Sequence, residues 1–406
     1  MINNDIVNNS KIFAYFMKTK KTKKNRTFRN KTARIYAIPS CDKDIKGVID
    51  VNAIRHNINY LKKKSGCDLM PVLKADAYGH GAVEIAKILR KLGIKYIGVA
   101  TLGEAIMLRD SGDKGRILAW LYDIDGDELK QALHMDIDIA IFDEKIIPKF
   151  ISLIPKNKKI NVTMFVDTGI NRAGISYDKA YDAFIEVSKC DKIKLEGMMS
   201  HLVSSGVKNS PIVNEQLRKF RDLRKRLAEI NIVPPLVHIA NTGGCLNYDV
   251  SDFTLSRPGS GVYGVGGDDE FNKSLSLAMT IKSYIIQIKE VNKGEGIGYD
   301  WTYTTPRKMK IAILPIGYAD IIPRSSSGKL YVYINGTKRK VLGTISMDQI
   351  MVEAKDSDKI SDDAIIFGNG KNCPQTIFDI AKEADLLSLE ILCHTGYRIN
   401  REYINK

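Results

Sequence analysis

Lys74 is the residue whose place in the sequence most clearly invites chemistry. It follows the apolar run at 71–73 and opens a glycine-rich segment that also contains Tyr78 and His80. An amine at the end of a buried strand loses hydration, and this favours its neutral form. A neutral lysine amine is a nucleophile that forms a Schiff base with carbonyl compounds. The ordinary alternative is a solvated lysine that ends a strand with its charge in water.

Other polar residues follow predicted strands farther along the chain. They are Asp167, Arg172, His201, Asn241, Thr242 and Arg257, and then the turn Gly259, Ser260 and Gly261. In a closed barrel of parallel strands, the carboxyl ends of the strands share one mouth. We therefore expect an amine, two guanidiniums, an imidazole and a glycine-rich turn to face one site. Taken singly, each has a plainer reading, such as a surface arginine, a core histidine or a simple turn.

The elements that must position these residues alternate between short apolar runs and amphipathic stretches. The apolar runs, which we interpret as strands, are 46–51, 68–74, 96–100, 116–121, 137–141, 160–166, 195–200, 236–240 and 253–257. The clearest amphipathic stretch is 212–230, where apolar residues recur every three or four positions and predict a helix. Such alternation predicts an α/β fold with a parallel sheet, either doubly wound or closed as a (β/α)8 TIM-type barrel. Nine runs are one more than that barrel requires, so we expect the first to belong elsewhere.

The pattern changes after about residue 275. The runs at 276–291, 308–316, 329–334, 339–347 and 363–368 are β-rich and separated by Gly and Asn turns. Helical periodicity returns only at 378–386. We predict a basic, disordered extension at 1–44, a barrel at 45–275 and a mainly β domain at 276–406. The string GEGIG at 294–298 lacks dinucleotide-loop spacing and is interpreted as a hairpin turn.

Composition limits the classes of function. The chain has 406 residues, 44% hydrophobic and 27% charged, which is typical of a globular protein. No apolar run reaches the roughly 20 residues that span a bilayer. Six scattered cysteines without a C-x-x-C pair argue against a metal site or disulfide framework and favour the cytoplasm. Residues 1–40 hold ten basic residues and one acidic residue, so this tail carries +9 of the net +15. A nucleic-acid partner is therefore not expected, although the tail leaves weak anion binding open.

A lysine nucleophile beside a glycine-rich turn suggests a phosphate-bearing aldehyde. Backbone N–H groups of such a turn bind anions, and pyridoxal 5′-phosphate (PLP) is held by enzymes as a lysine Schiff base. A barrel that binds a sugar phosphate remains an alternative. An aldolase-type enzyme also uses a lysine, but it does not need a second β domain.

At this point the chain resembles the alanine racemases, fold type III PLP enzymes, over roughly 45–403. The matching blocks, in order, are LKADAYGHG (73–81), SRPGSGVYG (256–264), GEGIGYD (294–300), PIGYAD (315–320), ISMDQ (345–349) and HTGYR (394–398). Asp76 stands where many members carry Asn. The family architecture also explains the surplus strand, because its first strand joins the C-terminal β domain.

The resemblance implies a role for each site residue. Lys74 holds PLP and exchanges the α-proton on the D side, whereas Tyr299, from the partner subunit of a homodimer, does so on the L side. Two opposed bases suit a reaction that works on both faces of one carbon. Arg257 donates to the pyridine nitrogen and keeps its own proton. His201 links Arg257 to the catalytic network by a hydrogen bond.

The remaining implied roles concern binding. Arg172 and the backbone N–H of the partner's Met347 hold the substrate carboxylate. Tyr318 and Asp348 line the entrance. The PLP phosphate is held by Tyr78, Thr242, Gly259, Ser260 and Tyr397. One departure affects the carboxylate site: many members carry a carbamylated lysine seven residues before the arginine, where this chain has Phe165.

The function that this resemblance implies is interconversion of L- and D-alanine, which supplies D-alanine for peptidoglycan. A racemase acting on serine, lysine or a wider range of amino acids remains an alternative. An amino acid decarboxylase of the same fold type is disfavoured, since such enzymes usually hold the pyridine nitrogen with a carboxylate. A PLP-carrier protein is disfavoured by the second domain.

Overall fold

A computed structural model describes residues 44–267, 269–370 and 373–406, without the side chains of 269 and 270. The predicted extension at 1–44 therefore lies outside the described residues, apart from Asp44. Across the described ranges, no helix is both long enough and apolar enough to cross a membrane.

Parallel strands form the barrel that the alternating pattern predicts, so the (β/α)8 barrel with a mainly β C-terminal domain is confirmed. Its strands are β2 (Asp68–Leu69), β3 (Tyr96–Thr101), β4 (Arg116–Leu121), β5 (Asp138–Ile141), β6 (Ile160–Asp167), β8 (Ile193–Met199), β9 (Leu236–His238) and β10 (Leu255–Ser256). Six form a sheet in the order β3-β4-β5-β6-β8-β9, with the short β7 (Ile175–Ser176) on β6. β2 and β10 pair with each other and connect the two ends of this sheet.

Backbone hydrogen bonds make both connections. The N–H of Leu73, beyond β2, donates to the Gly98 carbonyl of β3 (2.8 Å). On the other side, the N–H of Arg257 donates to the Ala240 carbonyl (2.7 Å). Lys74 and Arg257 therefore leave adjoining strands at the same end of the barrel.

The barrel interior is a packed apolar layer beneath that end. Its buried side chains are Met70, Leu118, Ala140, Phe165, Met199, Leu236 and Leu255. Such layers make the inside of a (β/α)8 barrel a core and not a channel. Phe165 is thus part of the support on which the site rests.

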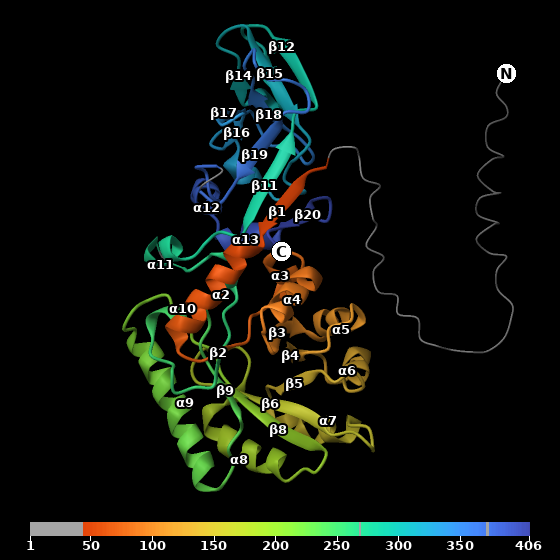
Figure 1. The fold of residues 1–406 in the computed structure, drawn as a ribbon, viewed down its shortest axis with the longest axis vertical. Coiled ribbons are helices and arrows are strands. Elements are labelled where there is room, and N and C mark those ends of the chain that lie inside the picture. The colour runs from red at the N-terminus through yellow and green to blue at the C-terminus, as the bar shows by residue number, and fades with distance from the viewer. Residues whose placement is uncertain (1–43, 268, 371–372) are drawn as a thin grey trace, which may run out of the picture. The chain divides into compact units, whose positions relative to one another are not determined.

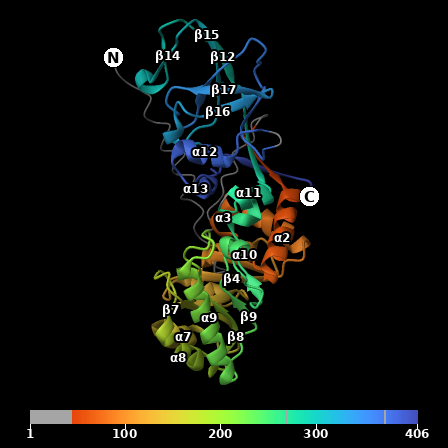
Figure 2. The same ribbon diagram turned by 90° about the vertical axis from the view of Figure 1, so that its left-hand side faces the viewer.

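Helices cover the outside of the barrel. They are α2 (Val51–Ser65), α4 (Ala82–Lys91), α5 (Leu102–Asp110), α6 (Asp127–Ala132), α7 (Ile147–Leu153), α8 (Tyr177–Ser188), α9 (Pro211–Glu229) and α10 (Thr242–Asn247). The predicted helix at 212–230 is confirmed as α9, which buries Val213, Phe220 and Leu227 on one face. Figures 1 and 2 show α8 and α9 side by side next to the parallel strands.

The other large sheet contains the first described strand. Its order is β12-β15-β18-β17-β16-β19-β11-β1-β20. The bounds are β1 (Lys46–Asp50), β11 (Met279–Tyr284), β12 (Gln287–Val291), β15 (Met309–Leu314), β16 (Tyr331–Ile334), β17 (Thr337–Leu342), β18 (Ile350–Glu353), β19 (Asp363–Phe367) and β20 (Asn400–Ile404). β1 pairs antiparallel with β11 and parallel with β20, and Figure 1 shows these three strands together.

Shorter elements complete this part of the chain. The glycine-rich string at 294–298 belongs to a hairpin of β13 (Gly296–Ile297) and β14 (Tyr303–Thr304). Two helices, α12 (Ile377–Ala384) and α13 (Ser388–Cys393), precede β20. The helix predicted at 378–386 is confirmed as α12.

Candidate active site

The segment that carries Lys74 has an unusual backbone. Lys74–Tyr78 is labelled α3 in Figure 1, yet Ala75, Asp76, Ala77 and Tyr78 have φ of 51°, 53°, 56° and 53°. These values are left-handed, a conformation that costs an L-residue roughly 1–2 kcal/mol. Four such residues in succession persist only where the surrounding structure holds them.

The glycines after this turn are required by close contacts. Gly79 has φ of 81°, and a Cβ there would collide with the Leu392 carbonyl of α13. Gly81 has φ of 88°, and its Cβ would collide with the Tyr403 hydroxyl of β20. The C-terminal segment therefore packs directly against the glycine-rich loop.

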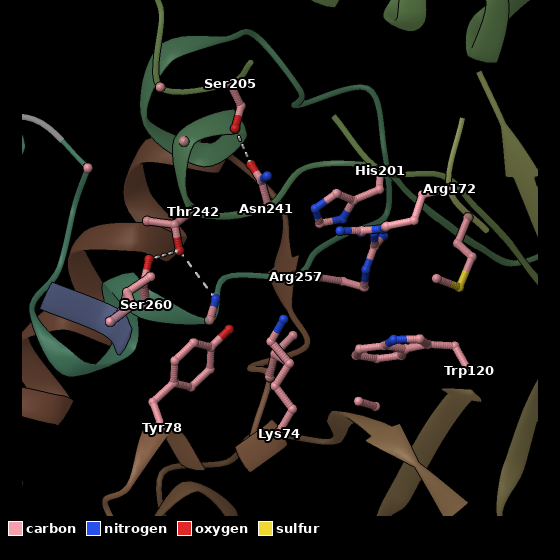
Figure 3. Close-up of a pocket in the computed structure, with 18 of the residues that line it drawn as sticks. Lys74, Tyr78, Trp120, Arg172, His201, Ser205, Asn241, Thr242, Arg257 and Ser260 are labelled. Carbon is pink, nitrogen blue, oxygen red and sulfur yellow. Dashed lines mark hydrogen bonds between the residues drawn. The ribbon is translucent and has the colours of Figure 1, made fainter. Parts of the chain in front are cut away.

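One cavity of about 630 Å³ brings together most of the residues that the sequence singled out. Those that line it are Lys74, Tyr78, Arg172, His201, Asn241, Thr242, Arg257, Gly259 and Ser260. Figure 3 shows the side chains of Lys74 and Tyr78 entering the space from one side and those of Arg257, His201 and Arg172 lying across from them. The polar residues expected at the strand ends thus meet at one mouth, apart from Asp167 and Gly261, which do not line this cavity.

The Lys74 amine has the electrostatic surroundings of a nucleophile. Its side chain is exposed at the mouth of the cavity, yet the protein around it still removes water from the amine. This desolvation lowers the pKa of Lys74, and the nearby Arg172 charge lowers it further. A lowered pKa increases the neutral, reactive fraction of the amine near neutral pH.

A small anion cradle lies beside the lysine. The Thr242 hydroxyl accepts from the N–H groups of Gly259 (3.2 Å) and Gly261 (3.1 Å) and from the Ser260 hydroxyl (3.2 Å). The Tyr78 hydroxyl occupies the place where a Cβ on Gly259 would lie. Converging N–H and hydroxyl groups of this kind suit the oxygens of a phosphate.

Arg257 is held rigidly in the floor of the site. Its side chain is buried, and its Nη1 donates to the Nδ1 (2.6 Å) and the carbonyl (2.8 Å) of His238. Its Nη2 donates to the Ser200 carbonyl (2.5 Å). Burial lowers the pKa of Arg257 to about 10, so the guanidinium is still charged at neutral pH.

His201 lies in the cavity without the hydrogen bond that we expected. Within the described residues, the Arg257 guanidinium bonds to His238 and Ser200 and not to the His201 ring. Burial, followed by the charges of Arg257 and Arg172, lowers the pKa of His201 to about 3. The ring is therefore neutral in the folded protein.

Arg172 is placed by its loop and not by a side-chain partner. The Asp167 carboxylate accepts from three successive N–H groups, those of Gly169 (2.8 Å), Ile170 (2.9 Å) and Asn171 (3.2 Å). Among the described residues, the Arg172 guanidinium makes no hydrogen bond or ion pair. Phe165, buried in the barrel, supplies no acceptor at the position seven residues earlier.

The other predicted site residues lie outside this cavity. Tyr299, Met347 and Asp348 line a separate hollow of about 820 Å³ in the C-terminal half of the sequence. Tyr299 is 66% exposed and Met347 51%, so neither is covered by the described chain. Tyr318 and Tyr397, 41% and 75% exposed, line neither hollow.

Some residues at the site were missed by reasoning from the sequence. Trp120 lines the cavity, His238 pairs with Arg257, and Glu104 accepts a hydrogen bond from the N–H of Ala75 (2.7 Å). Glu104 carried a usable signal, because a threonine followed three positions later by a glutamate marks a helix N-terminus. The Trp120 and His238 side chains had no comparable signal.

Comparisons with known proteins show the family to which the chain belongs. The chain matches the family models "Alanine racemase, N-terminal domain" over residues 49–266 and "Alanine racemase, C-terminal domain" over 278–403. It is 32% identical to an alanine racemase of Mycolicibacterium smegmatis over 366 residues, 88% of this chain and 94% of that protein. It is 34% identical to alanine racemase 2 of Caldanaerobacter subterraneus over 364 residues, with the same coverage.

Solved structures give the same result. The alanine racemase of Streptomyces lavendulae superposes with a TM-score of 0.84 at 30% identity, covering 90% of this chain and 98% of that one. That of Clostridium difficile 630 gives a TM-score of 0.83 at 31% identity, covering 90% and 97%.

Proposed function

The chain is an enzyme of the alanine racemase family, and we propose that it interconverts L- and D-alanine with PLP held covalently by Lys74. The observation that carries the proposal is the meeting of three groups in one cavity. These are an amine of lowered pKa, a buried cationic guanidinium and an anion cradle. Together they match the aldehyde, the ring nitrogen and the phosphate of PLP.

The residues present fit this cofactor. A Cβ on Gly259 would collide with the Tyr78 hydroxyl, so the cradle has no room for a side chain at this position. Thr242, Ser260 and Tyr78 would hold the phosphate, with Tyr397 joining them from the segment after α13. When bound, PLP withdraws electrons from the α-carbon of the amino acid and so makes its proton acidic.

Two bases would move that proton. Lys74 would remove the α-proton of D-alanine, or return a proton to the same face to form D-alanine. The phenol of Tyr299 would do the same for L-alanine on the opposite face. Tyr299 lines a different hollow from Lys74 in the described chain, which supports a Tyr299 supplied by a second copy. We therefore propose a homodimer with shared sites.

Arg257 would bind the cofactor ring, and Arg172 would bind the substrate. Arg257 cannot give up its proton at neutral pH, so it would donate a hydrogen bond to the ring nitrogen and leave that nitrogen unprotonated. His201 would contribute a neutral ring beside Arg257. Arg172 would bind the substrate carboxylate, together with the N–H of the partner's Met347.

The entrance would be lined by Tyr318 and Asp348. Asp348 is held by Arg398 (2.6 Å), which also donates to the buried Asp320 (2.9 Å). An arginine shared between two carboxylates fixes both, so the Asp348 side chain is directed by the fold.

The setting of the enzyme is part of the proposal. D-alanine would serve peptidoglycan synthesis. The enzyme would act in the cytoplasm, because the free cysteines of the described chain stay reduced there. We also propose that the chain divides into an extension at 1–44, a barrel at 45–275 and a β domain at 276–406. The boundary at 275 lies between α11 (Asp269–Ser274) and β11. The change from parallel to antiparallel pairing at this point supports the boundary at 275.

Two assays test the proposal. Racemisation of alanine, serine and lysine is measured side by side, and alanine is expected to have the highest kcat/KM. A higher value for another amino acid would change the substrate, whereas release of carbon dioxide without racemisation would indicate a decarboxylase. In parallel, Lys74→Ala is expected to lose the visible absorption of covalently bound PLP and most activity. Retention of both would contradict the role of Lys74.

A further inference from the structure

We propose that Glu104 is a positioning residue that places the Lys74 amine by holding the backbone of the turn that carries it. The inference rests on the proposed function, since it assumes that Lys74 is the residue that binds the cofactor and moves the proton. Glu104 itself lies in α5, within the first turn of the helix, and is not among the residues that line the cavity.

One carboxylate joins two parts of the barrel mouth. Its Oε1 accepts from the N–H of Ala75 (2.7 Å), the peptide directly after Lys74. Its Oε2 accepts from the N–H groups of Ala100 (2.9 Å) and Thr101 (3.0 Å) at the end of β3. Hydrogen bonds to an ionised acceptor are about twice as strong as neutral ones, so this bridge ties the lysine-bearing turn firmly to the sheet.

The turn needs such a hold at its beginning. Farther along, the Asp76 carboxylate accepts from the Ala82 N–H (2.7 Å), and the Tyr403 hydroxyl donates to the His80 carbonyl (2.7 Å). These bonds fix the distal part of the left-handed segment. Among the residues that the structure describes, the N–H of Ala75, the first strained peptide, donates only to Glu104.

The same carboxylate acts on the charge of the amine. Burial and Arg172 lower the pKa of Lys74, whereas Cys393 and Glu104 raise it. Glu104 therefore acts with Cys393 against burial and Arg172, and it keeps the amine from losing its proton too readily. Removal of this charge is expected to lower the pKa of Lys74 further.

The chain offers a matched control for the loss of a helix cap. Glu104 forms a capping box with Thr101 on α5, and Asp379 forms one with Thr376 on α12. Asp379 accepts from the Thr376 N–H (2.7 Å) and hydroxyl (2.8 Å) and makes no hydrogen bond to the Lys74 turn. D379N therefore removes a capping carboxylate without touching the site.

The test compares E104Q, E104D and D379N as PLP-loaded enzymes and as cofactor-free proteins. In E104Q the side chain keeps its size, but its NH₂ group must face one of the N–H groups that the carboxylate accepted from. We expect kcat to fall about tenfold or more, as for a displaced catalytic group, while KM for alanine changes less than about threefold. E104D keeps the charge but is too short to bridge, so its kcat also falls.

A second readout does not depend on turnover. In cofactor-free protein, the rate at which a limiting acylating reagent labels Lys74 is followed against pH by peptide mass spectrometry. The midpoint is expected to shift to lower pH in E104Q and to stay near the wild-type value in E104D and D379N. If E104Q does not fold, the fall in kcat of E104D relative to D379N decides the question.

The outcomes separate the two proposals. Wild-type kcat in E104D, or E104Q values equal to those of D379N in both readouts, would overturn the positioning role. If Lys74→Ala keeps the visible absorption of bound PLP, then Lys74 is not the cofactor residue and the proposed function fails instead.

Discussion

The hydroxyl of Tyr78 lies directly against the α-carbon of Gly259, so the anion cradle has no room for a side chain at that position. Tyr78 comes from the left-handed turn after Lys74, and Gly259 follows β10. The contact therefore joins the segment that carries the amine to the segment that forms the cradle.

Gly259→Ala is expected to weaken cofactor binding. Its methyl group must displace the Tyr78 ring or shift the cradle backbone, and either change disturbs groups proposed to hold the phosphate. The dissociation constant for PLP should rise by about tenfold or more, the effect of losing one charge-assisted hydrogen bond. Equilibrium titration of cofactor-free protein measures it.

The control is Gly206→Ala in the lining of the same cavity. A Cβ at Gly206 meets no atom within 4 Å, so this variant should bind PLP as wild type does. Equal affinities for the two variants would contradict the crowding argument.

Arg257→Gln is expected to destabilise the cofactor-free protein by about 3 kcal/mol. The change leaves the carbonyls of His238 and Ser200 without their cationic donor in a buried site. The free energy of unfolding from urea titration measures the loss. Arg221→Gln, which removes an exposed ion pair with Asp252, should cost less than about 1 kcal/mol. Similar losses in the two variants would mean that burial of Arg257 contributes little.

Mixing two variants tests whether the site is shared. Lys74→Ala and Tyr299→Phe homodimers should each be impaired, because each lacks one base in both sites. When subunits exchange, one site of a heterodimer carries both substitutions and the other carries neither. Activity should therefore rise on mixing. Activity that stays at the average of the two variants would place Tyr299 and Lys74 of the same chain in one site.

The barrel strands could be predicted because each is a short run of apolar residues, and such a run indicates burial without reference to the rest of the chain. The predicted strand at 116–121 coincides with β4, whose continuous apolar residues have no other good location. In contrast, β20 was missed, since Asn400–Ile404 begins with three polar residues in succession and pairs with β1, which is distant in sequence. A pairing of that kind has no signature in either segment alone.

The site likewise contains some features that have a local signal in the sequence and others that do not. Lys74 and Arg257 were found because the barrel directs residues at strand ends to one mouth. The left-handed turn was not predicted, because alanine at Ala75 and Ala77 gives no preference for positive φ. That conformation is imposed by distant groups such as Glu104. Phe165 was recognised as a departure, yet its place in the barrel core appears only in the structure.

Buried histidines should make the protein sensitive to acid. Burial lowers the pKa of His80 to about 4 and that of His201 to about 3, and it lowers the pKa of His238 well below its usual value of 6.5. Below pH 6.5 the unfolded chain therefore binds more protons than the folded one, so stability falls as the pH falls. Each histidine steepens this dependence by up to about 1.4 kcal/mol per pH unit until its folded pKa is reached.

The slope of unfolding free energy against pH, between pH 6.5 and 4.5, isolates one of these groups. His80→Gln removes a titrating ring, so its slope should be smaller than that of wild type by up to about 1.4 kcal/mol per pH unit, whatever its stability at neutral pH. Because the comparison uses slopes, a general loss of packing around His80 cannot imitate the result. An unchanged slope in His80→Gln would show that this ring is not held neutral by burial.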